Sequence, residues 1–414
     1  MTNTHASSDL IDSGYAFRRL LTTLAIMTMG SSCMYVVAVV LPEVQAEFGV
    51  SRSDASLPYT LLAIGFGVGG TFMGRFADRM GVSKVLLLGS VGLLSGFIWA
   101  GFSGGIWSFT LAHGVLLGFF GISATFGPLV ADTSLWWDKR RGIAVAVCAS
   151  GNYLAGSIWP SIAQYGVSTI GWRYTYVLLG VVCGLSMAGL ALLMRQRPPL
   201  ATASGTTKIK SHQVDKPFGV SLGRAQFLLC VAGVACCVAM AMPQVHIVAY
   251  CVDLGYGPAR GAEMLSLMLA SGIASRLISG MICDRIGGVR TLLMGSALQG
   301  IALLMFLPFN GLVSLYLISA MFGLFQGGLV PSYAIIVREY FPPSEAGSRV
   351  GAVMMCTMLG MALGGWMSGK LFDLTGSYQA AMINGVAWNM LNLSIALWLF
   401  SRIKKQESLR YSPL

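Results

Sequence analysis

Arg276 is a charged residue inside a long apolar run. It lies in Ser271–Gly280, and no Asp or Glu stands three or four positions away on either side. If this run crosses a membrane as a helix, inserting the charge costs about 2.5–3.5 kcal/mol. We therefore expect an anion to balance the guanidinium group, which binds a carboxylate through two parallel hydrogen bonds. The alternatives are a side chain that extends to the membrane surface and a carboxylate from another helix.

The preceding apolar run contains two more ionisable residues. His246 lies in Pro243–Tyr250, and its imidazole could hydrogen-bond a substrate carboxylate or carry a proton. If the two runs are antiparallel helices, side chains tilt toward each helix N-terminus, so His246 and Arg276 lean toward one cavity. The alternative for His246 is a packing contact. Asp253 ends the run, and it is either an interfacial helix end or a proton-binding carboxylate.

Polar and aromatic residues on other apolar runs could complete a binding pocket. The candidates are Tyr35, Phe119, Phe120, Asn152, Phe325 and Tyr333. Aromatic residues on such runs more often pack than bind, but a buried Tyr333 hydroxyl would need a hydrogen-bond partner. The nine cysteines show no metal-ligand spacing, and no catalytic Ser-His-Asp set or carboxylate pair is apparent. We expect no metal, no cofactor and no enzymatic activity.

The elements that position these residues are about twelve transmembrane helices. The chain has 414 residues, of which 55% are hydrophobic and only 10% are charged, whereas soluble domains carry roughly a quarter charged residues. Apolar runs of about 20 residues, each long enough to cross a bilayer, recur along the chain. The predicted spans are 20–41, 57–76, 84–103, 106–131, 142–167, 173–194, 225–251, 260–282, 291–309, 312–337, 349–370 and 378–400.

The net charge of +11 follows the predicted topology. With the N-terminus in the cytoplasm, the cytoplasmic segments hold 22 Lys and Arg residues and the opposite side holds four. This asymmetry is the positive-inside pattern of membrane proteins. It indicates that both termini are cytoplasmic, and it excludes a nucleic-acid-binding surface as the reason for the charge.

The chain is built as two similar halves. Residues 195–224 form a weakly apolar linker with several Pro and Lys residues, so we expect a six-helix bundle over 1–194 and another over 225–414. The motif Gly-x3-Asp-Arg-x-Gly-x2-(Lys/Arg) begins at Gly74 and again at Gly280, an offset of 206. Gly118 and Gly323 occupy corresponding positions in the two halves, at an offset of 205. A near-constant offset indicates internal duplication.

The repeated motif resembles the cytoplasmic loop signature of the major facilitator superfamily. The resemblance covers nearly the whole chain and implies an all-α fold of twelve helices in two pseudo-symmetric bundles. In that family the loop is a gate element, and the resemblance extends this role to Gly74, Asp78, Arg79, Asp284 and Arg285. The glycines would permit a tight turn and close helix approach, and the aspartates would cap a helix or pair with a neighbouring basic residue. The alternative is a simple topology anchor.

Two further segments resemble the monocarboxylate porter branch of this superfamily. The segment 135–151, with an aromatic pair and a basic cluster before a helix of small residues, is similar to the fifth-span signature of those porters. The Arg276 segment is similar to their eighth span, where an arginine binds the substrate carboxylate. The stretch 243–255 resembles related bacterial oxalate–formate exchangers. In animal porters an aspartate precedes the arginine by four residues, whereas Gly272 stands here, so the expected proton site shifts to Asp253 or His246.

We therefore expect a secondary active transporter that carries small monocarboxylates such as lactate or pyruvate across the inner membrane. It would act by alternating access as a monomer, in symport with a proton. The alternative is an exchanger of organic anions without net proton movement. A third hypothesis is a sensor on the same scaffold, which would bind ligand without accumulating it.

Overall fold

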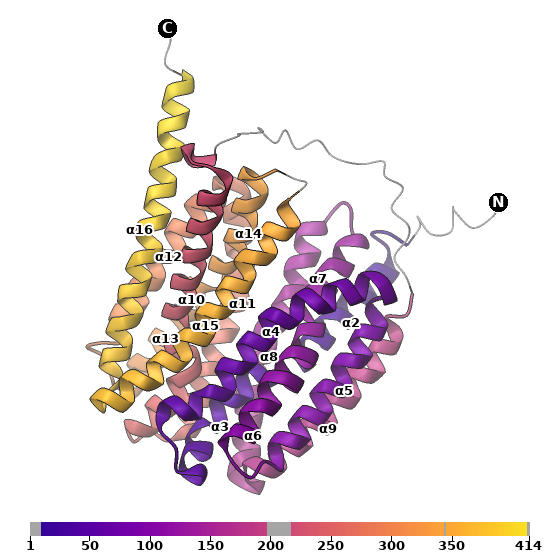
Figure 1. Ribbon diagram of the computed structural model, residues 1–414, viewed down its shortest axis with the longest axis vertical. Coiled ribbons are helices and arrows are strands. Elements are labelled where there is room, and N and C mark those ends of the chain that lie inside the picture. Colours follow the sequence, from indigo (N-terminus) through magenta and orange to yellow (C-terminus); the bar gives the residue numbers. More distant parts are fainter. Residues whose placement is uncertain (1–9, 197–216, 343–344, 412–414) are drawn as a thin grey trace, which may run out of the picture. The chain divides into compact units, whose positions relative to one another are not determined.

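The computed structural model describes residues 10–196, 217–342 and 345–411, which are helical and contain no strand. Twelve helical segments of these parts are long and apolar enough to cross a membrane, which confirms the predicted number of spans and the all-α fold class. The first half contains α2 (Gly14–Gly30), α3 (Ser32–Phe48), α4 (Arg52–Met80), α5 (Val82–Gly101), α6 (Ile106–Leu111), η1 (Ala112–Gly121), η2 (Ile122–Ala124), α7 (Phe126–Leu135), α8 (Arg141–Ile170) and α9 (Trp172–Leu193). The second half contains η3 (Pro217–Gly219), α10 (Leu222–Asp253), α11 (Pro258–Ile286), α12 (Gly288–Met305), α13 (Leu312–Gln326), α14 (Leu329–Tyr340), α15 (Ala346–Thr375) and α16 (Tyr378–Tyr411) (Figure 1).

Contacts between Cα atoms divide the chain into two compact units. Unit 1 is Met1–Thr206 with Val245–Ala270, and unit 2 is Thr207–Gln244 with Ser271–Leu414. The connected ends of α10 and α11 therefore belong with the first half of the sequence. The boundary between the units falls after Gln244 within the continuous helix α10, next to Pro243, which has no backbone N–H to donate to the helix. Most of the predicted linker, residues 197–216, lies outside the described residues, and the bundle boundaries at 194 and 225 stay a prediction.

Glycines bring helices close together within unit 1. The segment η1 packs along α4, and α5 packs along α9 (Figure 1). A Cβ atom on Gly69 of α4 would lie 2.5 Å from the carbonyl oxygen of Phe119, and one on Gly118 would lie 2.7 Å from that of Leu62. Small residues in membrane helices allow this approach, which strengthens the many weak dispersion contacts between backbones. The glycine-rich run 65–70 is thus a helix-packing surface.

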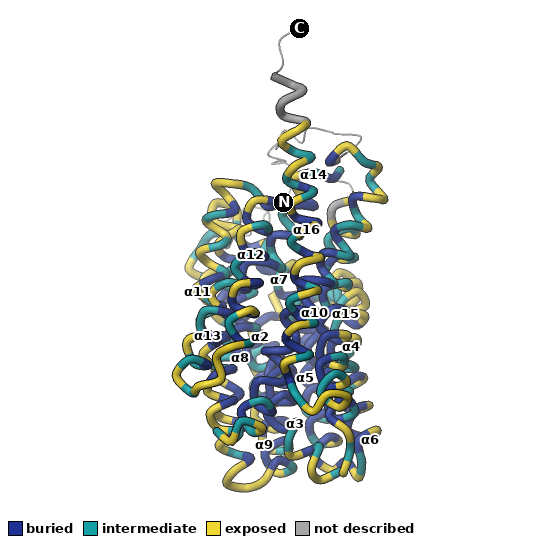
Figure 2. The backbone as a smooth tube through the Cα atoms, turned by 90° about the vertical axis from the view of Figure 1, so that its left-hand side faces the viewer, coloured by how far each residue is buried: buried dark blue, intermediate teal, exposed yellow. Residues whose placement is uncertain are grey.

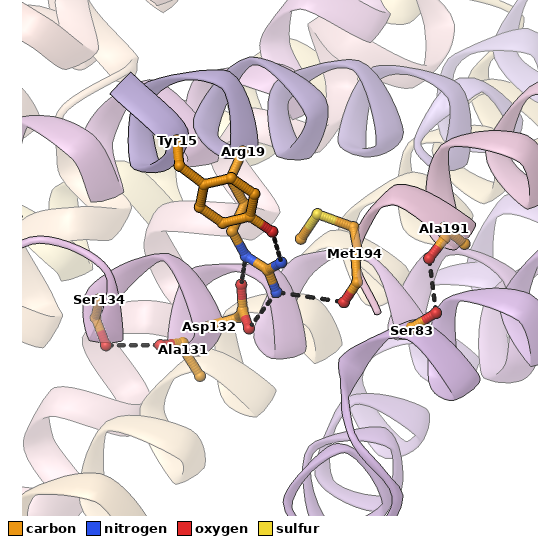
Figure 3. A network of polar contacts seen from close by, with 8 residues as sticks. All are labelled: Tyr15, Arg19, Ser83, Ala131, Asp132, Ser134, Ala191 and Met194. Carbon is orange, nitrogen blue, oxygen red and sulfur yellow. Dashed lines mark hydrogen bonds and ion pairs between the residues drawn. The ribbon is translucent and has the colours of Figure 1, made fainter. Parts of the chain in front are cut away.

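A buried ion pair joins the start of α2 to α7. The Arg19 guanidinium donates from Nε and Nη2 to the two carboxylate oxygens of Asp132, each at 2.9 Å (Figure 3). It also lies 4.6 Å from the centre of the Trp136 ring. Nη2 is 3.5 Å from the carbonyl oxygen of Met194, just after α9. The side chains of Arg19 and Asp132 are 3% and 5% exposed. The pair joins residues that are 113 positions apart in the sequence.

Removing one partner of this pair should destabilise the protein. In Asp132→Asn the Arg19 charge stays buried without a carboxylate, and such changes cost about 3–5 kcal/mol. Asp138→Asn is the matched control, since Asp138 pairs with Arg141 at 2.9 Å but both side chains are more than half exposed. An exposed pair contributes about 0–1 kcal/mol. Thermal unfolding of the detergent-solubilised protein should show a clear fall in Tm for Asp132→Asn alone, and equal falls in both variants would contradict the structural role.

Candidate functional site

Two residues predicted to bind substrate meet within unit 1. The Tyr35 hydroxyl of α3 donates to Asn152 Oδ1 of α8 at 2.7 Å, and Asn152 Nδ2 donates to the Ser31 hydroxyl at 3.2 Å. Ser31 lies at the interruption between α2 and α3, and α3 is buried from Ser32 to Leu41 (Figure 2). Tyr35 and Asn152 therefore form a polar cluster between the buried helix α3 and α8. Sequence spacing could nominate both residues, but it could not show that they touch.

Phe119 and Phe120 occupy a different place. They lie on η1 and pack with one another and against a buried cluster of Met73, Val85 and Ala124, from α4, α5 and η2. A Cβ on Gly92 of α5 would lie 2.6 Å from that of Phe120. The structure thus gives these two rings a packing role in the α4–α5–η1 interface, apart from the Tyr35 cluster.

The predicted proton site Asp253 forms an ion pair with Arg52. Arg52 Nη2 donates to Asp253 Oδ1 at 3.0 Å, and the two side chains are 9% and 30% exposed. Arg52 is the first residue of α4 and Asp253 the last of α10. The helix dipole disfavours a positive charge at the N-terminal end of α4 and a negative charge at the C-terminal end of α10. The ion pair offsets both unfavourable interactions. Sequence reasoning did not single out Arg52. It counted Arg52 only as one of the four basic residues on the side of the membrane opposite the cytoplasm.

A second contact holds the same connected ends of α10 and α11 within unit 1. The hydroxyls of Ser161 on α8 and Ser266 on α11 are 3.1 Å apart. A Cβ on Gly156 of α8 would lie 2.9 Å from the Tyr35 ring, and it would also collide with Leu269 of α11. The α10–α11 connection is therefore fixed to α4 by charge and to α8 by close packing. His246 is fully buried on this part of α10.

Arg276 belongs to unit 2, where it lies on α11 beside an interruption of the tenth span. The side chain is half-buried, and its Nε atom is buried. That span divides into α13, which ends at Gln326, and α14, which begins at Leu329. A Cβ on Gly327 would lie 2.5 Å from the carbonyl oxygen of Gly272 on α11, and one on Gly328 would collide with Ser279. Arg276 is on the edge of the helix face that makes these contacts. Whether it shares a cavity with His246 stays a prediction, because the two lie in different units.

Tyr333 uses its hydroxyl inside unit 2. The oxygen lies 2.8 Å from Asn392 Oδ1 of α16 and 3.0 Å from the carbonyl oxygen of Ala232 of α10, and the side chain is fully buried. Asn392 Nδ2 in turn donates to Ser296 of α12 at 2.7 Å. The hydrogen-bond partners expected for a buried Tyr333 hydroxyl are thus groups of the protein itself. Its role in substrate binding stays a prediction. Phe325 is half-buried on α13, next to Gln326.

The repeated loops form tight turns at corresponding places. Gly81 has φ +88° between α4 and α5, and Gly287 has φ +85° between α11 and α12, a conformation that glycine adopts without strain. Gly74 and Gly280 have open space around a Cβ, so the expected close approach at Gly280 is wrong. The charged members of the motif, Asp78, Arg79, Asp284 and Arg285, are exposed at the ends of α4 and α11. Within the described residues, neither Asp78 nor Asp284 forms an ion pair.

Glu339 is a residue that sequence reasoning missed near the second loop. Its carboxylate accepts the backbone N–H of Gly288 at 3.2 and 3.1 Å, at the start of α12. A negative charge stabilises the N-terminal end of a helix, so Glu339 fixes the end of α14 to this turn. No local pattern could reveal a contact between residues that are 51 positions apart. Among the residues that the structure describes, no group of three or more His, Cys, Asp or Glu is placed to hold a metal ion.

Comparisons with known proteins agree with this architecture. The chain is 25% identical over 331 residues to monocarboxylate transporter 13 of Rattus norvegicus, which covers 78% of this chain and 74% of the relative. It is 27% identical over 381 residues to the uncharacterized MFS-type transporter YcxA of Bacillus subtilis (strain 168), covering 87% and 89%. The solved structure of a peptide transporter POT in complex with sulfate matches the fold with a TM-score of 0.74 at 14% identity, over 98% of both chains. The family model of the Major Facilitator Superfamily matches residues 20–318 and 253–411. The chain therefore belongs to the major facilitator superfamily of multi-pass membrane transporters.

Proposed function

We propose that this protein transports small monocarboxylates of the lactate and pyruvate type in symport with a proton. The observation that carries the proposal is Arg276 on α11, a permanent positive charge within a membrane-spanning helix and beside an interrupted helix. Interrupted spans in transporters commonly form substrate sites because their freed backbone groups can bind ligand. The relatives named as monocarboxylate transporters support a carboxylate as the anion.

Alternating access follows from this arrangement. The carboxylate neutralises Arg276, which lowers the cost of enclosing the charge away from water. The bundles 1–194 and 225–414 then change their relative orientation around the site, with the loops at 74–84 and 280–290 as gates. Both termini face the cytoplasm of a cell with an inner membrane, as the basic residues favour, and the monomer is the transporting unit.

The Arg52–Asp253 pair offers a route for proton coupling. A proton on Asp253 cancels its charge and removes the attraction that holds the end of α10 to α4. Protonation would therefore favour opening at this end, and deprotonation would favour closing. His246, buried on the same helix seven residues earlier, is a second proton carrier.

Replacing Arg276 should weaken carboxylate binding. Charge-assisted hydrogen bonds contribute about 1.5–3 kcal/mol each, so Arg276→Ala should lower the apparent affinity for L-lactate roughly 10- to 100-fold. Arg276→Lys should keep part of the affinity, since lysine preserves the charge without the planar fork. The measurement is uptake of radiolabelled L-lactate into proteoliposomes with an inward proton gradient.

The control is Arg260→Gln, which removes an exposed arginine of the same helix that pairs with Glu263 at 3.0 Å. It should transport like the wild type. Unchanged uptake in Arg276→Ala would reject Arg276 as the carboxylate anchor. Wild-type uptake that requires preloaded counter-substrate and ignores the proton gradient would favour the organic-anion exchanger.

Asp253→Asn should separate proton coupling from substrate movement. The amide can neither bind nor release a proton, so gradient-driven accumulation should fall to the level of simple equilibration. Exchange of labelled for unlabelled lactate should persist, because it needs no net proton movement. Glu263→Gln, which alters an exposed acid of α11, is the matched control and should accumulate lactate normally. Full accumulation in Asp253→Asn would show that the proton binds elsewhere, with His246 the next residue to test.

A further inference from the structure

Two buried polar groups in unit 2 take part in no hydrogen bond. Among the described residues, neither Gln326 Nε2 nor the Ser275 hydroxyl has a hydrogen-bond partner. Gln326 is fully buried and Ser275 is 2% exposed. Buried polar groups are nearly always paired in native proteins, so two unpaired groups in one region need an explanation.

The two groups lie at the same place in the fold. Gln326 is the last residue of α13, and Gly327 follows it directly. A Cβ on Gly327 would lie 2.7 Å from Ser275 Cβ and 2.9 Å from Ser275 Oγ, so the backbone beside Gln326 touches Ser275. Ser275 in turn immediately precedes Arg276 on α11. The interruption of the tenth span therefore brings the Gln326–Gly327 backbone against Ser275, the residue that precedes the arginine on α11.

Gln244 holds the Gln326 side chain in one orientation. Its Nε2 donates to Gln326 Oε1 at 3.1 Å, and it is itself 7% exposed on α10 of the same unit. With its oxygen engaged, Gln326 keeps its Nε2 as a donor, while the Ser275 hydroxyl can donate or accept. An amide donor fixed near the α11 segment that carries the arginine matches a ligand with one more oxygen next to its carboxylate.

We propose that Gln326 and Ser275 make this transporter selective for monocarboxylates with an oxygen on the carbon next to the carboxylate, that is, 2-oxo and 2-hydroxy acids. Arg276 binds the carboxylate, Gln326 Nε2 donates to the neighbouring oxo or hydroxy oxygen, and Ser275 supplements either contact. Acids without that oxygen, such as propionate, leave both buried groups unpaired and bind more weakly. This assignment rests on the proposed function, because it presumes that Arg276 holds a carboxylate.

The test compares substrates that differ by one oxygen. Pyruvate, L-lactate and propionate compete against uptake of radiolabelled L-lactate by the full-length protein in proteoliposomes, and the inhibition constants give their relative affinities. Wild type should favour pyruvate and lactate over propionate about tenfold or more. Gln326→Leu should lose most of this preference, because affinity for lactate falls while affinity for propionate stays the same. Ser275→Ala, a smaller change, should reduce the preference in the same direction.

The control is Ser319→Ala on α13. Ser319 is also fully buried, and its hydroxyl likewise has no partner among the described residues. It precedes Gln326 by seven residues, about two helical turns, so its replacement should leave the preference unchanged. A loss of preference in Ser319→Ala equal to that in Ser275→Ala would overturn the assignment, as would an unchanged preference in both Gln326→Leu and Ser275→Ala.

The two levels of the hypothesis fail differently. If wild type moves none of the three acids, the proposed function fails and this inference falls with it. If wild type transports these acids and Arg276→Ala does not, the proposed function stands. The relative affinities for pyruvate, L-lactate and propionate then decide whether Gln326 and Ser275 set the selectivity. The Tm of Gln326→Leu and its elution on size exclusion would reveal a failure to fold. In that case Ser275→Ala and Gln326→Glu test the selectivity assignment instead. The glutamate keeps the shape but replaces the donor by a negative charge, so it should lose affinity for every carboxylate.

Discussion

The absence of water in the bilayer core is the constraint on which this structure depends. Each backbone N–H and C=O must find its partner within the protein, so the described chain crosses the membrane only as helices. An interruption is tolerated only where other protein packs against it. The break after Gln326 obeys this rule, because Gly327 and Gly328 lie against α11. The same rule makes every polar side chain in the spans informative, since each needs a partner or a function.

Two ion pairs of unit 1, Arg19–Asp132 and Arg52–Asp253, meet this need in different ways. Arg19 and Asp132 form two hydrogen bonds, are almost fully buried and link three helices, which suits a permanent structural contact. Arg52 Nη2 donates to Asp253 Oδ1 at 3.0 Å, and the Asp253 side chain is 30% exposed to solvent. Water can reach this second carboxylate, so the pair can exchange a proton and separate at a smaller cost. The burial of the Arg19–Asp132 pair therefore suits a permanent contact between helices. The exposure of the Arg52–Asp253 pair suits a contact that breaks and reforms in the proposed transport cycle.

The fold could be predicted from the sequence because span length, charge asymmetry and duplication are local or periodic signals. The twelve spans and the turns at Gly81 and Gly287 were within reach for this reason. Contacts between distant residues were not. Arg52 and Asp253 are 201 positions apart, and nothing near either residue names the other. Arg19 and Asp132, which are 113 positions apart, are another such pair. Residue type could nominate Tyr35 and Asn152, but only the packing of α3 against α8 joins them.

The duplicated scaffold carries an asymmetric site. Gln326 corresponds to Gly121 at the repeat offset of 205, and Arg276 corresponds to Gly70 at the offset of 206 that the loop motif on its own helix shows. Both halves interrupt the corresponding span, at η1 and η2 in the first and between α13 and α14 in the second. The first half, however, has only glycine where the second has an amide and a guanidinium. The interruption thus belongs to the shared architecture, whereas the charge that attracts an anion belongs to one half alone. Under the proposed function, a single anion bound to the second half would bias the whole transporter, because the first half offers no competing charge at the corresponding position.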